Sequence, residues 1–138
     1  MIPFPVPGWR FFDYIEGAKN PIEDWYQGLS EDGQNIFDAL LKQNQKVELP
    51  INWGGMKPMQ GPCKSEGIWE WRFQADGIQQ RILGIFGDSR KHAIFLIGCY
   101  HKQQVYKPPE CLETALRRAR AVREKIANVI ERKVKSDY

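Results

Sequence analysis

Two arginines beside a turn signal are the first residues in this sequence that could do chemistry. Arg72 and Arg81 lie on either side of the dipeptide Asp76-Gly77. Asp-Gly between two apolar segments is typical of a β-hairpin, which would place the arginines about 5 Å apart if they are directly opposite. Two neighbouring guanidinium groups suit a phosphate. An ordinary surface salt bridge to Glu70 or Asp76 is the alternative.

A polar segment, residues 100–107, carries the other candidate groups. The candidates for catalysis are His101 and Lys102, and those for RNA binding are Tyr100, Tyr106 and Lys107. Interleaved aromatic and basic side chains suit single-stranded RNA, because bases stack on the rings and cations hold the backbone. His101 is the candidate proton carrier, because imidazole titrates near neutrality. An exposed loop histidine without a function is the alternative.

Strand and helix signals alternate along the segments that must position these residues. The sequence predicts strands at 9–15, 67–74, 80–86 and 91–100, helices at 21–27, 30–44 and 108–135, and a loop at 50–62. Asn20 before Pro21 opens the first helix, and Ser30 caps the second. Apolar positions from Leu112 to Ile130 repeat at helical spacing. The order β-α-α-β-β-β-α predicts an α+β domain with a small antiparallel sheet and helices on one face.

Alternation along the strand 67–74 separates two sets of side chains. One set is Trp69, Trp71 and Phe73, which share one face and which we expect to lie in the core. Glu70 and Arg72 share the other face, which we expect to be uncovered.

Length and composition restrict the class of protein. The chain has 138 residues, 42% of them hydrophobic and 27% charged, which predicts one folded domain over residues 1–138. No apolar run approaches the roughly 20 residues that cross a bilayer, and the proline-rich start has no basic region of the kind that opens a signal peptide. Three cysteines without metal spacing predict reduced thiols in a cytoplasmic protein that needs no cofactor.

Charge is unevenly distributed along the chain. Residues 1–62 carry five Lys or Arg and eight Asp or Glu, whereas residues 107–138 carry nine and five. This distribution suggests that an anionic partner meets the second half of the chain, and a solvated basic helix is the alternative. The motifs of P-loop nucleotide hydrolases, zincins, α/β-hydrolases and Rossmann enzymes do not occur in the sequence.

Two fragments that follow each other in the sequence resemble a known family. The first is Gly67-Ile-Trp-Glu-Trp-Arg-Phe with Gln80-Arg-Ile-Leu, and the second runs from Ile94 to Lys102 and on to Lys107-Pro108. Together they are similar to the strands "G-L-W-E-L-R … Y-R-I" and "V-L-L-H-G-F-x-K-K-x-x-x-x-P" of phage-derived Gp49-like and HigB-type toxins in the RelE/ParE superfamily. The resemblance spans about residues 63–123. The family's second lysine is Gln103 here.

The resemblance implies a type II toxin with a RelE-like fold that cleaves mRNA, often on the ribosome, and is silenced by a cognate antitoxin. Arg72, Arg81 and Lys102 fall where the family's basic site residues are expected. The chemistry would be attack of a 2′-hydroxyl on the adjacent phosphorus, with Arg81 stabilising the phosphorane, Arg72 and Lys102 positioning the phosphate and His101 carrying the proton.

Two other functions stay open at this point. ParE-like members of the superfamily bind DNA gyrase and catalyse nothing, and an inactive phage-derived module would only bind a partner. By family analogy, the antitoxin would be acidic, or would carry an amphipathic helix that lies over the basic face or on the terminal helices.

Overall fold

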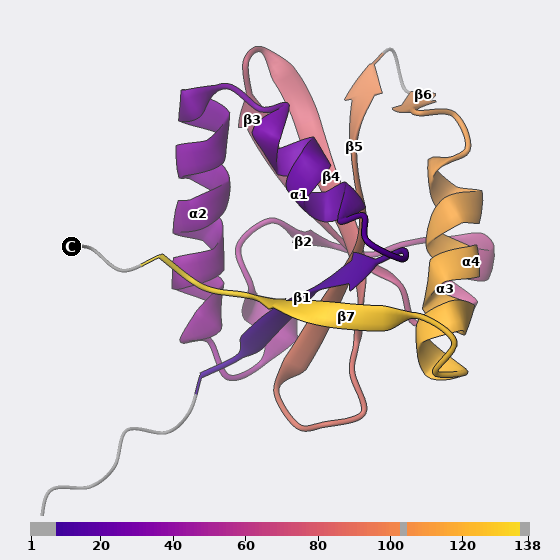
Figure 1. Ribbon diagram of the computed structural model, residues 1–138. Coiled ribbons are helices and arrows are strands. Elements are labelled where there is room, and N and C mark those ends of the chain that lie inside the picture. The colour runs from indigo at the N-terminus through magenta and orange to yellow at the C-terminus, as the bar shows by residue number, and fades with distance from the viewer. Residues whose placement is uncertain (1–7, 103–104, 136–138) are drawn as a thin grey trace, which may run out of the picture.

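One mixed sheet with helices on both faces forms the framework of the protein. The computed structural model describes residues 8–102 and 105–135. Within them the strands are β1 (Arg10–Ile15), β2 (Met56–Lys57), β3 (Trp69–Ala75), β4 (Ile78–Phe86), β5 (His92–Lys102), β6 (Val105–Lys107) and β7 (Asn128–Arg132). The helices are α1 (Pro21–Gln27), α2 (Glu31–Gln45), α3 (Gly61–Ser65) and α4 (Cys111–Arg123), with a 3₁₀ turn at Pro50–Asn52. The predicted α+β class is confirmed (Figure 1).

The sheet has the strand order β2-β3-β4-β5-β1-β7, with β6 added beside β5. The antiparallel meander β3-β4-β5 agrees with the prediction. The prediction of a purely antiparallel sheet is wrong, because β1 pairs with β5 in the parallel direction. After β1 the chain forms α1 and α2 and then enters the sheet again at β2, which is an edge strand. The meander β3-β4-β5 then runs from that edge toward β1, so β5 becomes the neighbour of β1.

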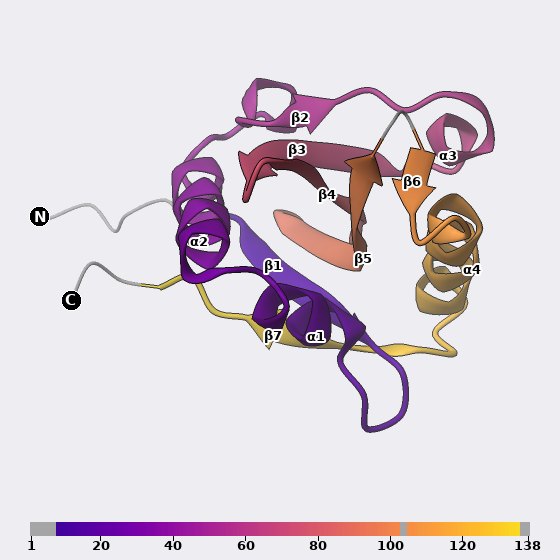
Figure 2. The ribbon, with the colours of Figure 1, turned by 90° about the horizontal axis from the view of Figure 1, so that it is seen from above.

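Helices cover the sheet from two sides, and Figure 2 shows α2 and α4 on opposite sides of β5. The first core lies under α1 and α2 and contains Trp71 and Phe95. The second core lies under α3 and α4 and contains Leu83 and Leu96. The expectation of helices on one face is therefore wrong. Since β4 and β5 are apolar on both faces, each face has to be removed from water.

The predicted starts of the first two helices are confirmed at the level of single hydrogen bonds. The Asn20 side chain accepts from the backbone N–H groups of Ile22 and Glu23, and Ser30 accepts from that of Gly33. These bonds satisfy donors that the first turn of a helix leaves without a partner.

The last helix is much shorter than the sequence predicts. α4 ends at Arg123, and Lys125 takes a left-handed conformation with φ of 59°. The N–H groups of Lys125 and Ile126 then bond to the carbonyls of Val122 and Ala121, which is the Schellman arrangement of a helix end. Glycine usually occupies the left-handed position, so a lysine there gives no sequence signal.

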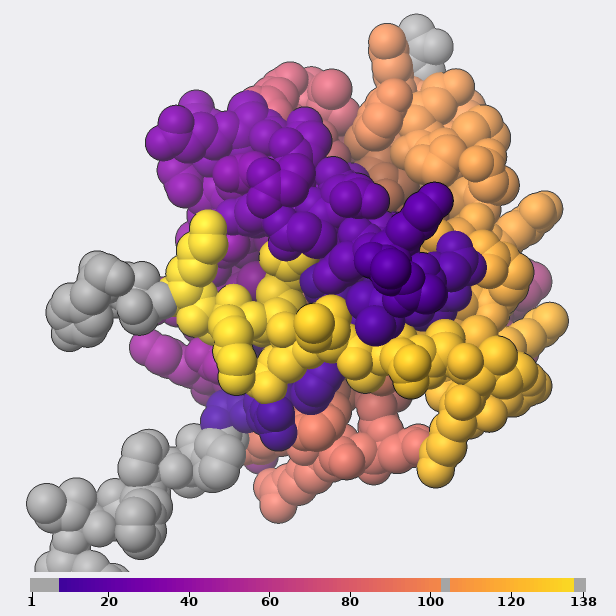
Figure 3. All heavy atoms as spheres, viewed as in Figure 1, coloured from indigo at the N-terminus to yellow at the C-terminus, as the bar shows by residue number. Residues whose placement is uncertain are grey.

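After this turn the chain returns as β7, which pairs antiparallel with β1. In the space-filling view, atoms of β7 cross the front of the molecule from the end of α4 (Figure 3). Val129 and Ile130, predicted as part of a helical stripe, lie in this strand. Their β-branched side chains favour an extended backbone.

Two predicted loops also contain regular structure. Residues 50–62 include the 3₁₀ turn, β2 and the start of α3, and the polar segment 100–107 contains the end of β5 and the strand β6. Residues 103 and 104, Gln103 among them, lie outside the described part of the chain. No helix in the described ranges is long and apolar enough to cross a membrane.

Candidate functional site

The β3–β4 hairpin places Arg72 directly opposite Arg81, as the sequence predicts. Asp76 and Gly77 form the turn with φ of 60° and 71°, which suits a two-residue hairpin. The Asp76 carboxylate accepts hydrogen bonds from the backbone N–H and hydroxyl of Ser30, so it holds the turn against the start of α2. The suggested salt bridge between Asp76 and an arginine is therefore absent among the described contacts.

A buried carboxylate lies between the arginines. Glu70 has no exposed surface. It accepts hydrogen bonds from Arg72 Nε at 2.5 Å, from Arg81 Nη1 at 3.1 Å and from the Tyr106 hydroxyl at 2.5 Å. The alternative that paired the arginines with Glu70 is thus correct about the partner, but the carboxylate is buried and only Arg72 of the two arginines reaches solvent. The expected uncovered face is wrong, because Tyr106 on β6 covers this part of the sheet.

Arg81 is at the centre of the group and is only 5% exposed. Besides Glu70, its Nη1 donates to the Tyr106 hydroxyl at 3.2 Å. Its Nη2 donates to Gln79 Oε1 at 2.7 Å and contacts His101 Nδ1 at 3.0 Å. Both terminal nitrogens are therefore occupied, and in this arrangement Arg81 orients its neighbours and does not face solvent. We call Glu70, Arg72, Gln79, Arg81, His101 and Tyr106 the polar cluster.

The contact with Arg81 determines which ring nitrogen of a neutral His101 carries the proton. A guanidinium only donates, so Nδ1 of His101 accepts, and the proton of a neutral ring is on Nε2. The His101 ring also packs edge-on against Tyr106, with ring centroids 4.8 Å apart. Nε2 is therefore a donor in this neutral form and not a base.

Tyr106 is held in its protonated form. Burial, and then the hydrogen bond to Glu70, raise the pKa of Tyr106. The phenol donates to Glu70 while it accepts from Arg81, so it links the carboxylate to the guanidinium. It does not supply a base at neutral pH.

Arg72 is the cation of the polar cluster that reaches solvent. Its side chain is 32% exposed, and Nε makes its bond to Glu70. No hydrogen bond joins its two terminal nitrogens to another described residue. Lys57 on β2 lies opposite Glu70 in the β2–β3 register, so this exposed lysine belongs to the same face. Sequence reasoning missed Lys57, because it lies in a Pro- and Gly-rich segment without strand periodicity.

The other predicted site residues lie on the opposite face. Tyr100 pairs with Gln80 and with Lys107, and Lys102 pairs with Val105. Side chains alternate along a strand, so these residues point away from Arg81 and His101. The structure thus brings together Arg72, Arg81, His101 and Tyr106, but separates them from Tyr100, Lys102 and Lys107.

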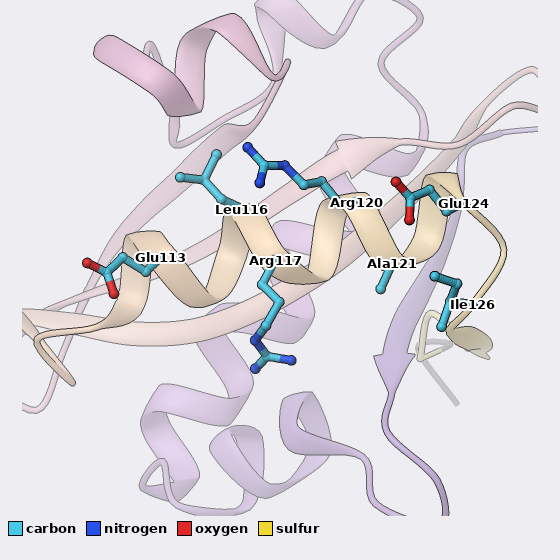
Figure 4. Close-up of a pocket in the computed structure, with 7 residues that line it drawn as sticks. All are labelled: Glu113, Leu116, Arg117, Arg120, Ala121, Glu124 and Ile126. Carbon is cyan, nitrogen blue, oxygen red and sulfur yellow. The ribbon is translucent and has the colours of Figure 1, made fainter.

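A hollow of about 470 Å³ lies on the outer surface of α4, away from the polar cluster (Figure 4). Its lining residues are Glu113, Leu116, Arg117, Arg120, Ala121, Glu124 and Ile126. The arginines form ion pairs, Arg117 with Glu16 and Arg120 with Glu66. With two carboxylates also in the lining, the hollow has no strong charge of one sign and contains no predicted site residue.

Comparison with known proteins adds no relative. No protein-family model, no curated protein and no solved structure matches this chain. In the described ranges, no three or more His, Cys, Asp or Glu residues are grouped so that they could hold a metal ion. The functional interpretation therefore depends on the residues and the geometry of the polar cluster.

Proposed function

We propose that the protein is an endoribonuclease toxin of the RelE/HigB type, which cleaves mRNA at the polar cluster. The observation that supports this proposal is the convergence of β3, β4 and β6 on one buried carboxylate, with His101 of β5 in contact with Arg81. Around Glu70 they bring a half-buried arginine, a buried arginine, a histidine and a tyrosine onto one face. Cations beside a proton carrier are what phosphodiester cleavage by a 2′-hydroxyl needs.

The geometry suggests a division of roles within this proposal. Attack of the 2′-oxygen on phosphorus forms a cyclic phosphate and breaks the bond to the 5′-oxygen. The open terminal nitrogens of Arg72 bind the phosphate, and Nε2–H of the neutral His101 ring donates a hydrogen bond to the leaving 5′-oxygen. Water takes the 2′-hydroxyl proton, and water protonates the leaving oxygen. Because Arg81 is buried, it becomes a positioning residue that holds the His101 ring, and Glu70 holds Arg81 in turn.

The proposed partners are an mRNA, on the ribosome, and a cognate antitoxin in the cytoplasm. The basic last part of the chain supports an anionic partner. An acidic or amphipathic antitoxin helix would lie over the polar cluster or on α4.

The test is expression in cells without the antitoxin, followed by mapping of new mRNA 5′ ends. Wild-type protein is expected to produce cuts within translated messages. Arg72→Ala is expected to reduce the cleavage rate about 10²–10³-fold, because it removes one charge-stabilising group. Gln74→Ala is the matched control, since Gln74 lies on the same face of β3, is exposed and should cut at the wild-type rate.

Two further variants separate the faces of the sheet. His101→Gln should reduce cleavage, and Lys102→Ala should leave it near the wild-type rate, because Lys102 is on the opposite face. Loss of cleavage in Lys102→Ala with full cleavage in Arg72→Ala would move the site to that face and overturn the assignment.

A binding protein without catalysis is the second candidate, and a separate surface favours it. An apolar groove of about 450 Å³ lies beside β2 and is lined in part by Pro50, Ile51, Met59, Trp69 and Phe86. Ile51 and Phe86 are both exposed there, and contiguous exposed apolar surface is typical of a site that contacts a partner. Growth arrest without RNA cuts would indicate a gyrase-type poison, and neither effect would indicate an inert binding module.

A further inference from the structure

Three cysteines that are distant in the sequence lie in one buried group. Cys99 is on β5, Cys111 is the first residue of α4 and Cys63 is in α3, and all three belong to the second core. They are free thiols. The Sγ atoms of Cys99 and Cys111 are 2.9 Å apart. This separation is about 0.9 Å longer than a disulfide bond of about 2.05 Å.

We propose that Cys99 and Cys111 are a redox modification site, at which a peroxide converts the thiol pair into a disulfide. The bond would join β5 to the start of α4. It would therefore close a loop from residue 99 to residue 111 that carries His101 and Tyr106 of the polar cluster. The inference concerns the thiols alone and does not depend on the proposed ribonuclease activity.

The chemistry needs one peroxide for each disulfide. One thiolate attacks a peroxide oxygen and becomes a sulfenic acid, and the other oxygen leaves as water after protonation. The second thiol then attacks the sulfenic sulfur, forms the S–S bond and releases a second water molecule. Two thiols and one hydrogen peroxide thus give one disulfide and two waters. A peroxide is the smallest common oxidant for thiols, which suits a pair with almost no exposed surface.

The environment of the pair sets the rate of this reaction. The hydrogen bond that Cys99 shares with Cys111, and then burial, raise the pKa of Cys99. Because the thiolate is the nucleophile, oxidation is expected to be slow at neutral pH and faster as the pH rises. Cys63 is a third thiol in the same core, so it is the natural internal control.

The experiment is treatment of the folded full chain with hydrogen peroxide, followed by digestion with trypsin under non-reducing conditions. Each cysteine is in a separate tryptic peptide: Cys63 in 47–64, Cys99 in 92–102 and Cys111 in 103–117. Trypsin does not cut after Lys57 or Lys107, because a proline follows each of them. The expected product is a cross-linked pair of 92–102 and 103–117 that dithiothreitol separates. Alkylation of the oxidised chain after unfolding should label Cys63 alone.

Variants and a stability measurement complete the test. Cys63→Ser should still form the cross-link, and Cys111→Ser should not. The oxidised wild type should melt at a higher temperature than the reduced form, with reversal by dithiothreitol. The proposal is overturned if the folded chain gives no cross-link under conditions that oxidise the urea-unfolded chain, or if peptide 47–64 is the one joined to 103–117.

Discussion

The substitution Glu70→Leu tests whether one buried carboxylate stabilises the polar cluster. It removes the negative charge and leaves an apolar side chain of similar size in the second core. Arg81 would then keep its positive charge in a site where its side chain is 6% exposed and Glu70 is its charged partner. Desolvated charges without a partner are among the most destabilising features in proteins.

The expected magnitude follows from the three hydrogen bonds that Glu70 accepts. Loss of one partner from a buried ion pair costs about 3–5 kcal/mol. Arg72 adds less than about 1 kcal/mol, because its exposed guanidinium can be hydrated. The Tyr106 hydroxyl loses an acceptor, which costs about 1 kcal/mol. We therefore expect the free energy of unfolding to fall by at least about 3 kcal/mol.

The assay is urea unfolding followed by far-UV circular dichroism and tryptophan fluorescence. Glu66→Leu is the matched control, because Glu66 pairs with Arg123 and Arg120 at the surface and its loss should cost less than about 1 kcal/mol. The double variant Glu70→Leu/Arg81→Met removes both charges and should recover much of the lost stability.

Two results would refute this reasoning. A loss of less than about 1 kcal/mol in Glu70→Leu would mean that Arg81 finds water or another partner, so that the pair is not desolvated. A double variant as unstable as Glu70→Leu alone would mean that the loss comes from packing and not from an unpaired charge.

Three further predictions follow from local geometry. Gly98→Ala should cost about 1–3 kcal/mol and lower the melting temperature, because its Cβ would lie 2.1 Å from Trp25 Cδ2. Lys125→Gly should raise the free energy of unfolding by about 0.5–1 kcal/mol in the same assay, because glycine takes the left-handed conformation without strain; no gain would show that the lysine is not strained there. Tyr106→Phe should change the pH dependence of the free energy of unfolding. The raised pKa of folded Tyr106 gives stability that is present below the unfolded pKa of about 10 and is lost as the pH rises through the folded value. The urea midpoint of the variant should therefore fall less steeply than that of the wild type above about pH 10.

Features that depend on neighbours in the sequence could be predicted. The Asn20 and Ser30 caps, the Asp76-Gly77 turn and the alternation along β3 each involve residues within a few positions of one another. The pairing of Arg72 with Arg81 belongs to this group, because a two-residue turn fixes the register of a hairpin.

The end of the last helix could not be predicted in the same way. Helical spacing of apolar residues continues past Arg123, but the helix ends where Lys125 takes a conformation that glycine usually signals. The stretch Asn128–Arg132 becomes a strand because β1 offers an unpaired edge. An open strand edge satisfies backbone hydrogen bonds along its whole length, and no local pattern reports that it is present.

The sequence by itself determined the α+β class, the hairpin with its two arginines and the residues available for chemistry. The tertiary structure alone decided which of these residues meet. In the folded chain Glu70 is buried between the arginines, Tyr106 of β6 lies over them, and Lys102 lies on the opposite face. The physical reason is that a charge is buried only where partners from several strands satisfy it together, and those partners are 11 and 36 residues from Glu70 along the chain.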